Sequence, residues 1–139
     1  MGRSHTHRVR VRYGECDPSG VVFNAHYFAY FDLALTELWR EAAGGYGAMM
    51  EEGVDLQVVE ATARYKAPAR FDDELEVFIR TASIGRSSWH WEFAVHHCES
   101  VELLARAEQV MVLIERAARA PVPVPADMRD AVEAFEGGV

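Results

Sequence analysis

The sequence predicts an α+β fold in which one long helix packs on an antiparallel sheet. One stretch with helical periodicity follows the N-terminal segment, and four stretches with the alternating pattern of strands come after it. Tight turn sequences separate the later strands, and no internal repeat or long linker interrupts the chain. We therefore expect one domain that covers residues 1–139.

Composition and charge limit the classes of function. Half of the 139 residues are hydrophobic and 26% are charged, as in ordinary soluble domains. The formal net charge of −8 disfavours nonspecific binding to nucleic acid or to an anionic membrane surface. No signal-peptide pattern and no apolar run of membrane-spanning length occurs. Because the two cysteines, Cys16 and Cys98, are too few for a disulfide framework, we expect a cytoplasmic protein.

Periodicity places the first strand and the long helix. Residues 8–13 alternate basic and apolar, which is typical of a strand with one buried face. From about residue 25 to 43, apolar residues recur at three- and four-residue steps, as on an amphipathic helix, and Gly44-Gly45 ends it. Further apolar residues such as Leu33 widen the apolar face. We therefore expect a central helix, wrapped by the sheet or by a partner subunit.

The later elements follow in order along the chain. Residues 110–114 are apolar at every position, which fits a strand covered on both faces. The proline-rich segment 120–125 is expected to be extended. The pattern predicts a short helical turn at 47–53, a strand at 54–65 with a bulge near Val58-Val59, strands at 75–81, 89–96 and within 101–115, and a helix at 126–135.

A polar, turn-rich loop before the helix carries a carboxylate, Asp17. Pro18 pushes the backbone of Asp17 toward extended geometry, and Gly20 permits a turn, so the carboxylate is held at a bend. The start of the following helix has backbone N–H groups without partners inside the helix, which makes it an anion site. This pairing suits acyl transfer, in which one group activates or delivers a nucleophile and N–H donors stabilise the oxyanion.

Two segments of the chain resemble a known family. Residues 11–32 contain an Asp-Pro-Ser-Gly-Val-Val loop that leads into an aromatic-rich helix, and residues 64–77 contain Pro-Ala-Arg-Phe-Asp-Asp-Glu-Leu. Both resemble the 4-hydroxybenzoyl-CoA thioesterase branch of the hot-dog-fold acyl-CoA thioesterases, and the similarity covers essentially the whole chain. The resemblance implies a five- or six-stranded antiparallel sheet wrapped around a long central helix. It also implies a homodimer or homotetramer with active sites at the dimer interface.

The resemblance assigns roles to residues near the helix start. The catalytic carboxylate of the family matches Asp17, and the backbone N–H that polarises the thioester carbonyl matches Asn24. Many members carry His or Tyr where this chain has Asn24, and often Asn or Ser where it has His26. The backbone donor is present whatever the side chain is, whereas substrate preference depends on the side chains at Asn24 and His26. His26 is a candidate for orienting water or contacting the acyl group, with an exposed or interface histidine as the alternative.

Substrate-binding candidates lie in the helix and in the later loops. Coenzyme A carries phosphates, which need cations at the rim of a pocket. The candidates are Tyr27 in the helix and the cations Lys66, Arg70 and Arg86.

Other reactive residue types are weaker candidates. Cys16 adjoins Asp17 but has no histidine positioned as its base, and neighbours in an extended stretch point to opposite sides. Asp32 falls next to the apolar stripe of the helix, so we expect a buried structural carboxylate. His96 and His97 lack a third ligand at credible spacing, so we expect no metal site.

The sequence therefore favours a hydrolase that cleaves an acyl-CoA thioester to the free acid and coenzyme A, without a metal or redox cofactor. Asp17 would act as nucleophile or as general base on water. Two alternatives stay open, namely a hot-dog hydratase or dehydratase of acyl thioesters and a non-catalytic acyl-CoA-binding module. The acyl group, and the choice between coenzyme A and a carrier protein, are also open.

Overall fold

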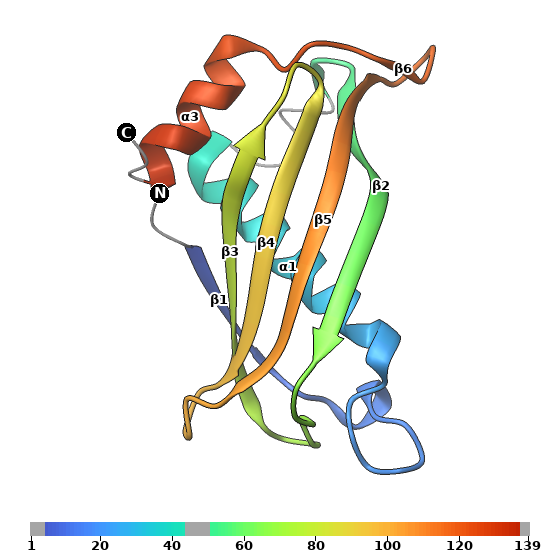
Figure 1. Cartoon of the computed structure of the whole chain (residues 1–139), viewed down its shortest axis with the longest axis vertical. Helices are drawn as coiled ribbons and strands as arrows, with labels where there is room; N and C mark the ends of the chain where they lie inside the picture. Colours follow the sequence, from blue (N-terminus) through green and yellow to red (C-terminus); the bar gives the residue numbers. More distant parts are fainter. Residues whose placement is uncertain (1–4, 44–50, 137–139) are drawn as a thin grey trace.

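The computed structural model describes residues 5–43 and 51–136, and it has the α+β arrangement that the sequence predicts. Five long antiparallel strands form one sheet in the order β1-β3-β4-β5-β2, and a two-residue strand, β6, pairs with β5. Figure 1 shows this sheet curled around the helix α1. The strands are β1 (His5–Arg10), β2 (Val54–Tyr65), β3 (Glu74–Ile84), β4 (Ser88–His97), β5 (Leu103–Glu115) and β6 (Ala120–Pro121).

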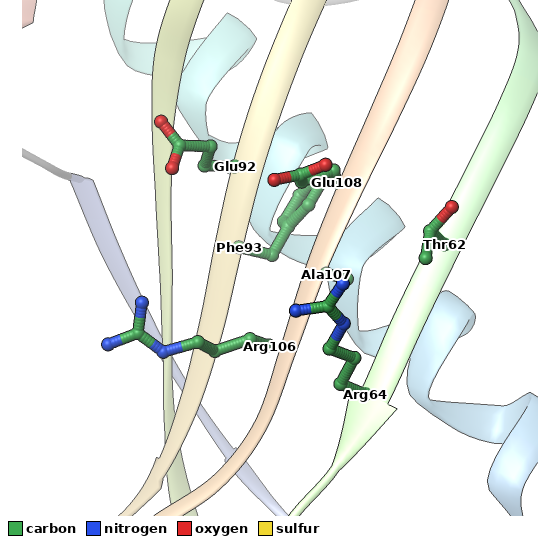
Figure 2. Close-up of a pocket in the computed structure, with 7 residues that line it drawn as sticks. All are labelled: Thr62, Arg64, Glu92, Phe93, Arg106, Ala107 and Glu108. Atoms are coloured by element: carbon green, nitrogen blue, oxygen red, sulfur yellow. The ribbon is translucent and has the colours of Figure 1, made fainter.

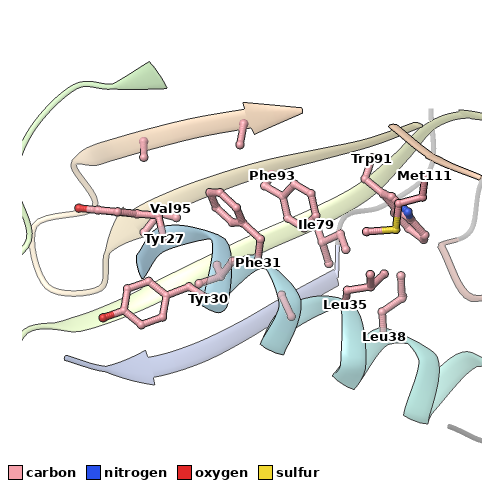
Figure 3. Packing of buried hydrophobic residues seen from close by; sticks show 14 of the residues in the cluster. Tyr27, Tyr30, Phe31, Leu35, Leu38, Ile79, Trp91, Phe93, Val95 and Met111 are labelled. Atoms are coloured by element: carbon pink, nitrogen blue, oxygen red, sulfur yellow. The ribbon is translucent and has the colours of Figure 1, made fainter. Parts of the chain in front are cut away.

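The central helix packs on the concave face of the sheet. It begins with one 3₁₀ turn, Asn24–His26, and continues as α1 (Tyr27–Ala43). Phe31 is fully buried, with its ring centroid 4.7 Å from that of Phe93 on β4 (Figure 3). This burial confirms the expected central helix, whose N-terminal half packs against the sheet through Phe31.

A second helix, α3 (Ala126–Glu136), packs against α1 and confirms the C-terminal helix of the sequence analysis. Glu136 is buried and accepts a hydrogen bond from the backbone N–H of Thr81, where the pairing of β3 with β4 shifts register. Within residues 5–43 and 51–136, no helix is long and apolar enough to cross a membrane.

The first strand differs from its prediction. Residues 8–13 were expected to be extended, but β1 covers His5–Arg10 and a 3₁₀ turn occupies Tyr13–Glu15. The turn forms because the Glu15 carboxylate accepts hydrogen bonds from both the backbone N–H and the side-chain Nε of Arg12. Periodicity cannot detect such a side-chain contact, so the strand ends earlier than its alternating pattern does.

The other predictions had mixed outcomes. The bulge in β2 is confirmed by a register shift between Val58 and Glu60. The expectation that 110–114 is covered on both faces was wrong, because Val110 and Val112 are only half-buried. Leu33 is 47% exposed, so the apolar face of the helix is narrower in this chain than expected. The predicted helix stop at Gly44-Gly45 and most of the predicted turn at 47–53 lie outside the described residues.

Candidate active site

The loop that carries Asp17 is a tight, hydrogen-bonded turn. The backbone N–H of Asp17 donates to the carbonyl of Val21 at 2.9 Å, and the N–H of Gly20 donates to the carbonyl of Asp17 at 2.9 Å. Gly20 has a φ of +86°, a region that favours glycine, so the sequence places glycine where the turn requires it. An isolated β-bridge between Cys16 and Val22 closes the loop at its base. Asp17 is therefore presented at a bend, as predicted.

The Asp17 side chain is ionised at neutral pH and faces solvent in part. The Ser19 hydroxyl and the Ser19 backbone N–H both donate to Oδ1, and these donors hold the pKa of Asp17 below its usual value. The backbone N–H of Val21 adds to the same effect. The carboxylate form is the one that a nucleophile or a general base needs.

The helix start presents two backbone donors. The carbonyl of Phe23 accepts the N–H of His26 at 2.8 Å. Because C=O and N–H point in opposite directions across a trans peptide, the N–H of Asn24 is directed back out of the helix start. Asn24 and Ala25 stand in the first turn, where a helix has no earlier carbonyl to accept these N–H groups. These two N–H groups form a potential oxyanion site.

A cleft of about 350 Å³ brings Asp17 and Asn24 together. Tyr27, a buried residue of the lining, has a pKa raised by burial, an effect that a hydrogen bond with the backbone of Ala69 partly offsets. Tyr65 comes from β2 and donates its hydroxyl to the carbonyl of Asn24 at 2.8 Å. The cleft is lined by Asp17, Val21, Val22, Asn24, Tyr27, Tyr65, Lys66, Ala67 and Pro68.

The predicted cations lie at different distances from this cleft. Lys66 lines it, and the backbone of Arg70 forms an isolated bridge with Val21 beside it. Arg86 lies in the turn between β3 and β4, at the opposite end of the sheet from the Asp17 loop (Figure 1). The 11 residues of β3 separate the two ends by roughly 30 Å. One copy of the chain therefore brings Lys66 to the cleft and the backbone of Arg70 beside it, whereas Arg86 lies at the far end of the sheet.

His26 contacts a second carboxylate. Its Nε2 lies 3.3 Å from Oε2 of Glu15, and its ring packs edge-on against Tyr30 with centroids 5.0 Å apart. Among the described residues that line the cleft, His26 does not appear. Asp17 and His26 are thus close in sequence but belong to different contacts.

Two residues of this region were missed by sequence reasoning. Tyr65 was read only as part of a strand, and its contact with Asn24 joins residues 41 apart in the chain. Glu15 was not singled out, although it is 8% exposed and lies only two residues before Asp17. Neither contact has a sequence signal, because both depend on how β2 and the loop pack against the helix.

Two other candidates are placed differently from Asp17. Asp32 is exposed, so the expectation of a buried structural carboxylate was wrong; it faces away from the stripe that carries Phe31. The Sγ of Cys16 lies 3.9 Å from the carbonyl oxygen of Arg12, and Cys16 is absent from the described residues that line the cleft.

The convex face of the sheet has a separate hollow, shown in Figure 2. In the strand register, Glu92 lies opposite Glu108 and Arg106 lies opposite Arg64. Charges of both signs therefore line the hollow. The hollow lies on the face of the sheet opposite to α1 and is distinct from the Asp17 cleft.

Comparison of the sequence with known proteins finds a matching family model and several relatives. The model of the thioesterase-like superfamily matches residues 11–132. The acyl-CoA thioester hydrolase YbgC of Escherichia coli is 34% identical over 117 residues, which is 84% of this chain and 87% of that protein. The 4-hydroxybenzoyl-CoA thioesterase of Pseudomonas sp. strain CBS-3 is 27% identical over 124 residues, covering 81% of this chain and 84% of that protein.

A solved structure supports the same fold. The crystal structure of Slr0204, a 1,4-dihydroxy-2-naphthoyl-CoA thioesterase from Synechocystis, superposes with a TM-score of 0.85 at 23% identity. The match covers 93% of this chain and 95% of that one. The hot-dog arrangement implied by the two sequence segments is therefore confirmed.

Proposed function

The chain belongs to the thioesterase-like superfamily, and on that premise we propose that it hydrolyses acyl-CoA thioesters, with Asp17 as the catalytic carboxylate. One observation carries this assignment. Asp17, an ionised carboxylate, and Asn24, at the start of the helix, line the same cleft, so a thioester bound there would have both a nucleophile or base and an oxyanion site.

The reaction can follow either of two balanced routes. In one, Asp17 attacks the thioester carbonyl, the C–S bond breaks, and water then opens the acyl–aspartyl anhydride. In the other, Asp17 takes a proton from water as the water attacks, and the proton passes to the leaving thiolate. Both yield free acid and coenzyme A. Both place the developing oxyanion at the N–H groups of Asn24 and Ala25.

Cations beside the cleft support a coenzyme A substrate. Lys66 lines the cleft and Arg70 lies beside its loop, where they can bind phosphate groups. Arg86 can meet the same substrate only if a second copy of the chain supplies it. Tyr27 is an aromatic residue of the cleft lining and is a candidate for contacting the acyl group.

We also propose that the protein is a homodimer or a larger homo-oligomer. In the described part of the sheet β2 pairs only with β5, so its other edge can pair with a second copy. Val58 and Val59 on this strand are 53% and 61% exposed, which fits an apolar contact. The molar mass from light scattering during size-exclusion chromatography would test this, and the mass of a monomer would contradict it. Because Cys16 and Cys98 are free thiols, the compartment that we propose is the cytoplasm.

Thiol release from a panel of short, long, branched and aromatic acyl-CoAs tests the proposed activity. Stoichiometric release of free thiol and acid supports hydrolysis. Loss or gain of water with the thioester intact would instead indicate a hydratase, and saturable binding without turnover would indicate a binding module.

A further inference from the structure

Glu15 is a buried carboxylate next to the proposed catalytic loop. Its Oε1 accepts the backbone N–H of Arg12 at 2.9 Å and the hydroxyl of Tyr30 at 2.8 Å. Its Oε2 accepts the Nε–H of Arg12 at 2.9 Å and faces Nε2 of His26 at 3.3 Å. Burial raises the pKa of Glu15, but these donors outweigh burial and leave the pKa below its usual value. Both oxygens are occupied, so Glu15 is not available as a nucleophile.

The partners of Glu15 come from both ends of the Asp17 loop and from the helix. Arg12 precedes the loop, His26 lies in the first helical turn, and Tyr30 lies one turn further along α1. The backbone of Glu15 joins the same ends, because its carbonyl accepts the N–H of Phe23 at 3.0 Å. Glu15 therefore fastens the base of the loop to the helix that carries the proposed oxyanion donors.

Asp17 has no comparable anchor of its own. Among the described residues, the hydrogen bonds to its side chain come from Ser19 and Val21, which belong to the same loop. The distance between the Asp17 carboxylate and the N–H of Asn24 consequently depends on how the loop is held, both at its base and at the Val21–Arg70 bridge. Misplacement by about 1 Å can lower a rate by about a hundredfold.

We propose that Glu15 is a positioning residue for thioester hydrolysis, holding the Asp17 loop in register with the backbone donors at Asn24 and Ala25. Tyr30 and His26 act through it, and His26 contacts Glu15 instead of the thioester. This inference rests on the proposed function. It concerns how the site is held, not which group reacts.

The Glu15→Gln variant tests the proposal. The amide keeps the shape of the side chain. Its NH₂ group, however, faces hydrogen-bond donors from which the carboxylate accepts. We expect kcat to fall about ten- to a hundredfold while KM changes less than threefold, because the cations at the cleft are untouched. Glu108→Gln, on the convex face of the sheet, is the matched control and should leave both constants unchanged.

A double-mutant cycle separates positioning from general loss of structure. Tyr30→Phe removes one donor to Glu15, and we expect it to lower kcat about three- to tenfold. Because Tyr30 acts through Glu15, adding Tyr30→Phe to Glu15→Gln should lower kcat by less than twofold more. The four proteins of the cycle are compared only if they have the same circular dichroism spectrum and the same oligomeric state. If Glu15→Gln does not fold, Tyr30→Phe and His26→Asn alone carry the test.

The outcomes distinguish the two proposals. Unchanged kcat in Glu15→Gln or, if that variant does not fold, in both Tyr30→Phe and His26→Asn overturns the positioning role even when Asp17→Asn is inactive. Full turnover in Asp17→Asn instead overturns the proposed function. Multiplicative effects of Glu15→Gln and Tyr30→Phe would likewise contradict a role of Tyr30 through Glu15.

Discussion

The hydroxyl of Tyr65, on β2, donates a 2.8 Å hydrogen bond to the backbone carbonyl of Asn24 at the start of the helix. That carbonyl shares a peptide unit with the N–H of Ala25. A donor on the carbonyl polarises the unit and strengthens its N–H as a donor. The strand thereby fixes the peptide that we assign to the oxyanion site.

Removing that hydroxyl should therefore slow the reaction without unfolding the protein. For Tyr65→Phe we expect kcat to fall about fivefold, the effect of one hydrogen bond of about 1 kcal/mol. Steady-state kinetics on the preferred acyl-CoA measure it. Tyr13→Phe, at a hydroxyl that is exposed to solvent, is the control. Equal kcat in wild type and Tyr65→Phe would show that the Tyr65 contact does not tune the site.

Stability in acid should depend on Glu15. The pKa of Glu15 is lowered in the folded protein, so the folded state binds its proton less readily than the unfolded state does. Its contribution is complete above the unfolded pKa of about 4.3 and is lost as pH falls through the lower folded pKa. Urea unfolding measured between pH 6 and pH 3 should therefore show that the free energy of unfolding changes less with pH in Glu15→Gln than in the wild type. Parallel curves for the two proteins would exclude this linkage.

The turn between β4 and β5 holds a strained residue. Val101 has a φ of +55°, a region that a β-branched residue rarely adopts, and it is 75% exposed. Asn tolerates this conformation, so Val101→Asn should raise the free energy of unfolding by about 1 kcal/mol. Chemical denaturation measures the change. Val59→Asn, in extended β2, should give no gain, and a loss of stability in Val101→Asn would refute the assignment of strain.

The cations of the cleft should affect substrate binding more than chemistry. Lys66→Gln should raise KM for an acyl-CoA about tenfold, with a smaller effect at high salt, because a charged contact to phosphate is lost. The same substitution at Arg86 separates two arrangements. An unchanged KM means that one chain supplies the phosphate contacts, and a raised KM means that a second copy contributes Arg86. An unchanged KM in Lys66→Gln would remove Lys66 from the binding site.

Local pattern accounts for much of the fold. The strand at 54–65, its bulge and the helix at 126–135 follow from periodicity and from turn and proline positions. The order of strands in the sheet does not follow from it, because β1 pairs with β3 although α1 and β2 lie between them in the sequence. Likewise, periodicity placed Asp32 beside the apolar stripe but could not tell which arc of the helix the curled sheet leaves open.

The candidate site was predictable only in part. Asp17 and Asn24 lie in a local motif, so the loop chemistry and the resemblance indicated both, and the cleft contains both. Tyr65 and the Glu15–His26 contact arise from tertiary packing and have no periodic signature. For the same reason Arg86 could be named as a cation but not placed relative to the cleft.

The most direct test of the account is single-turnover thiol release by Asp17→Asn beside the wild-type protein, at matched fold and oligomeric state. Asp130→Asn, on the exposed side of α3, serves as the matched control. The account predicts a fall of about a hundredfold or more in Asp17→Asn, the scale of a lost nucleophile or general base, and no change in the control. Equal release by wild type and Asp17→Asn would contradict it.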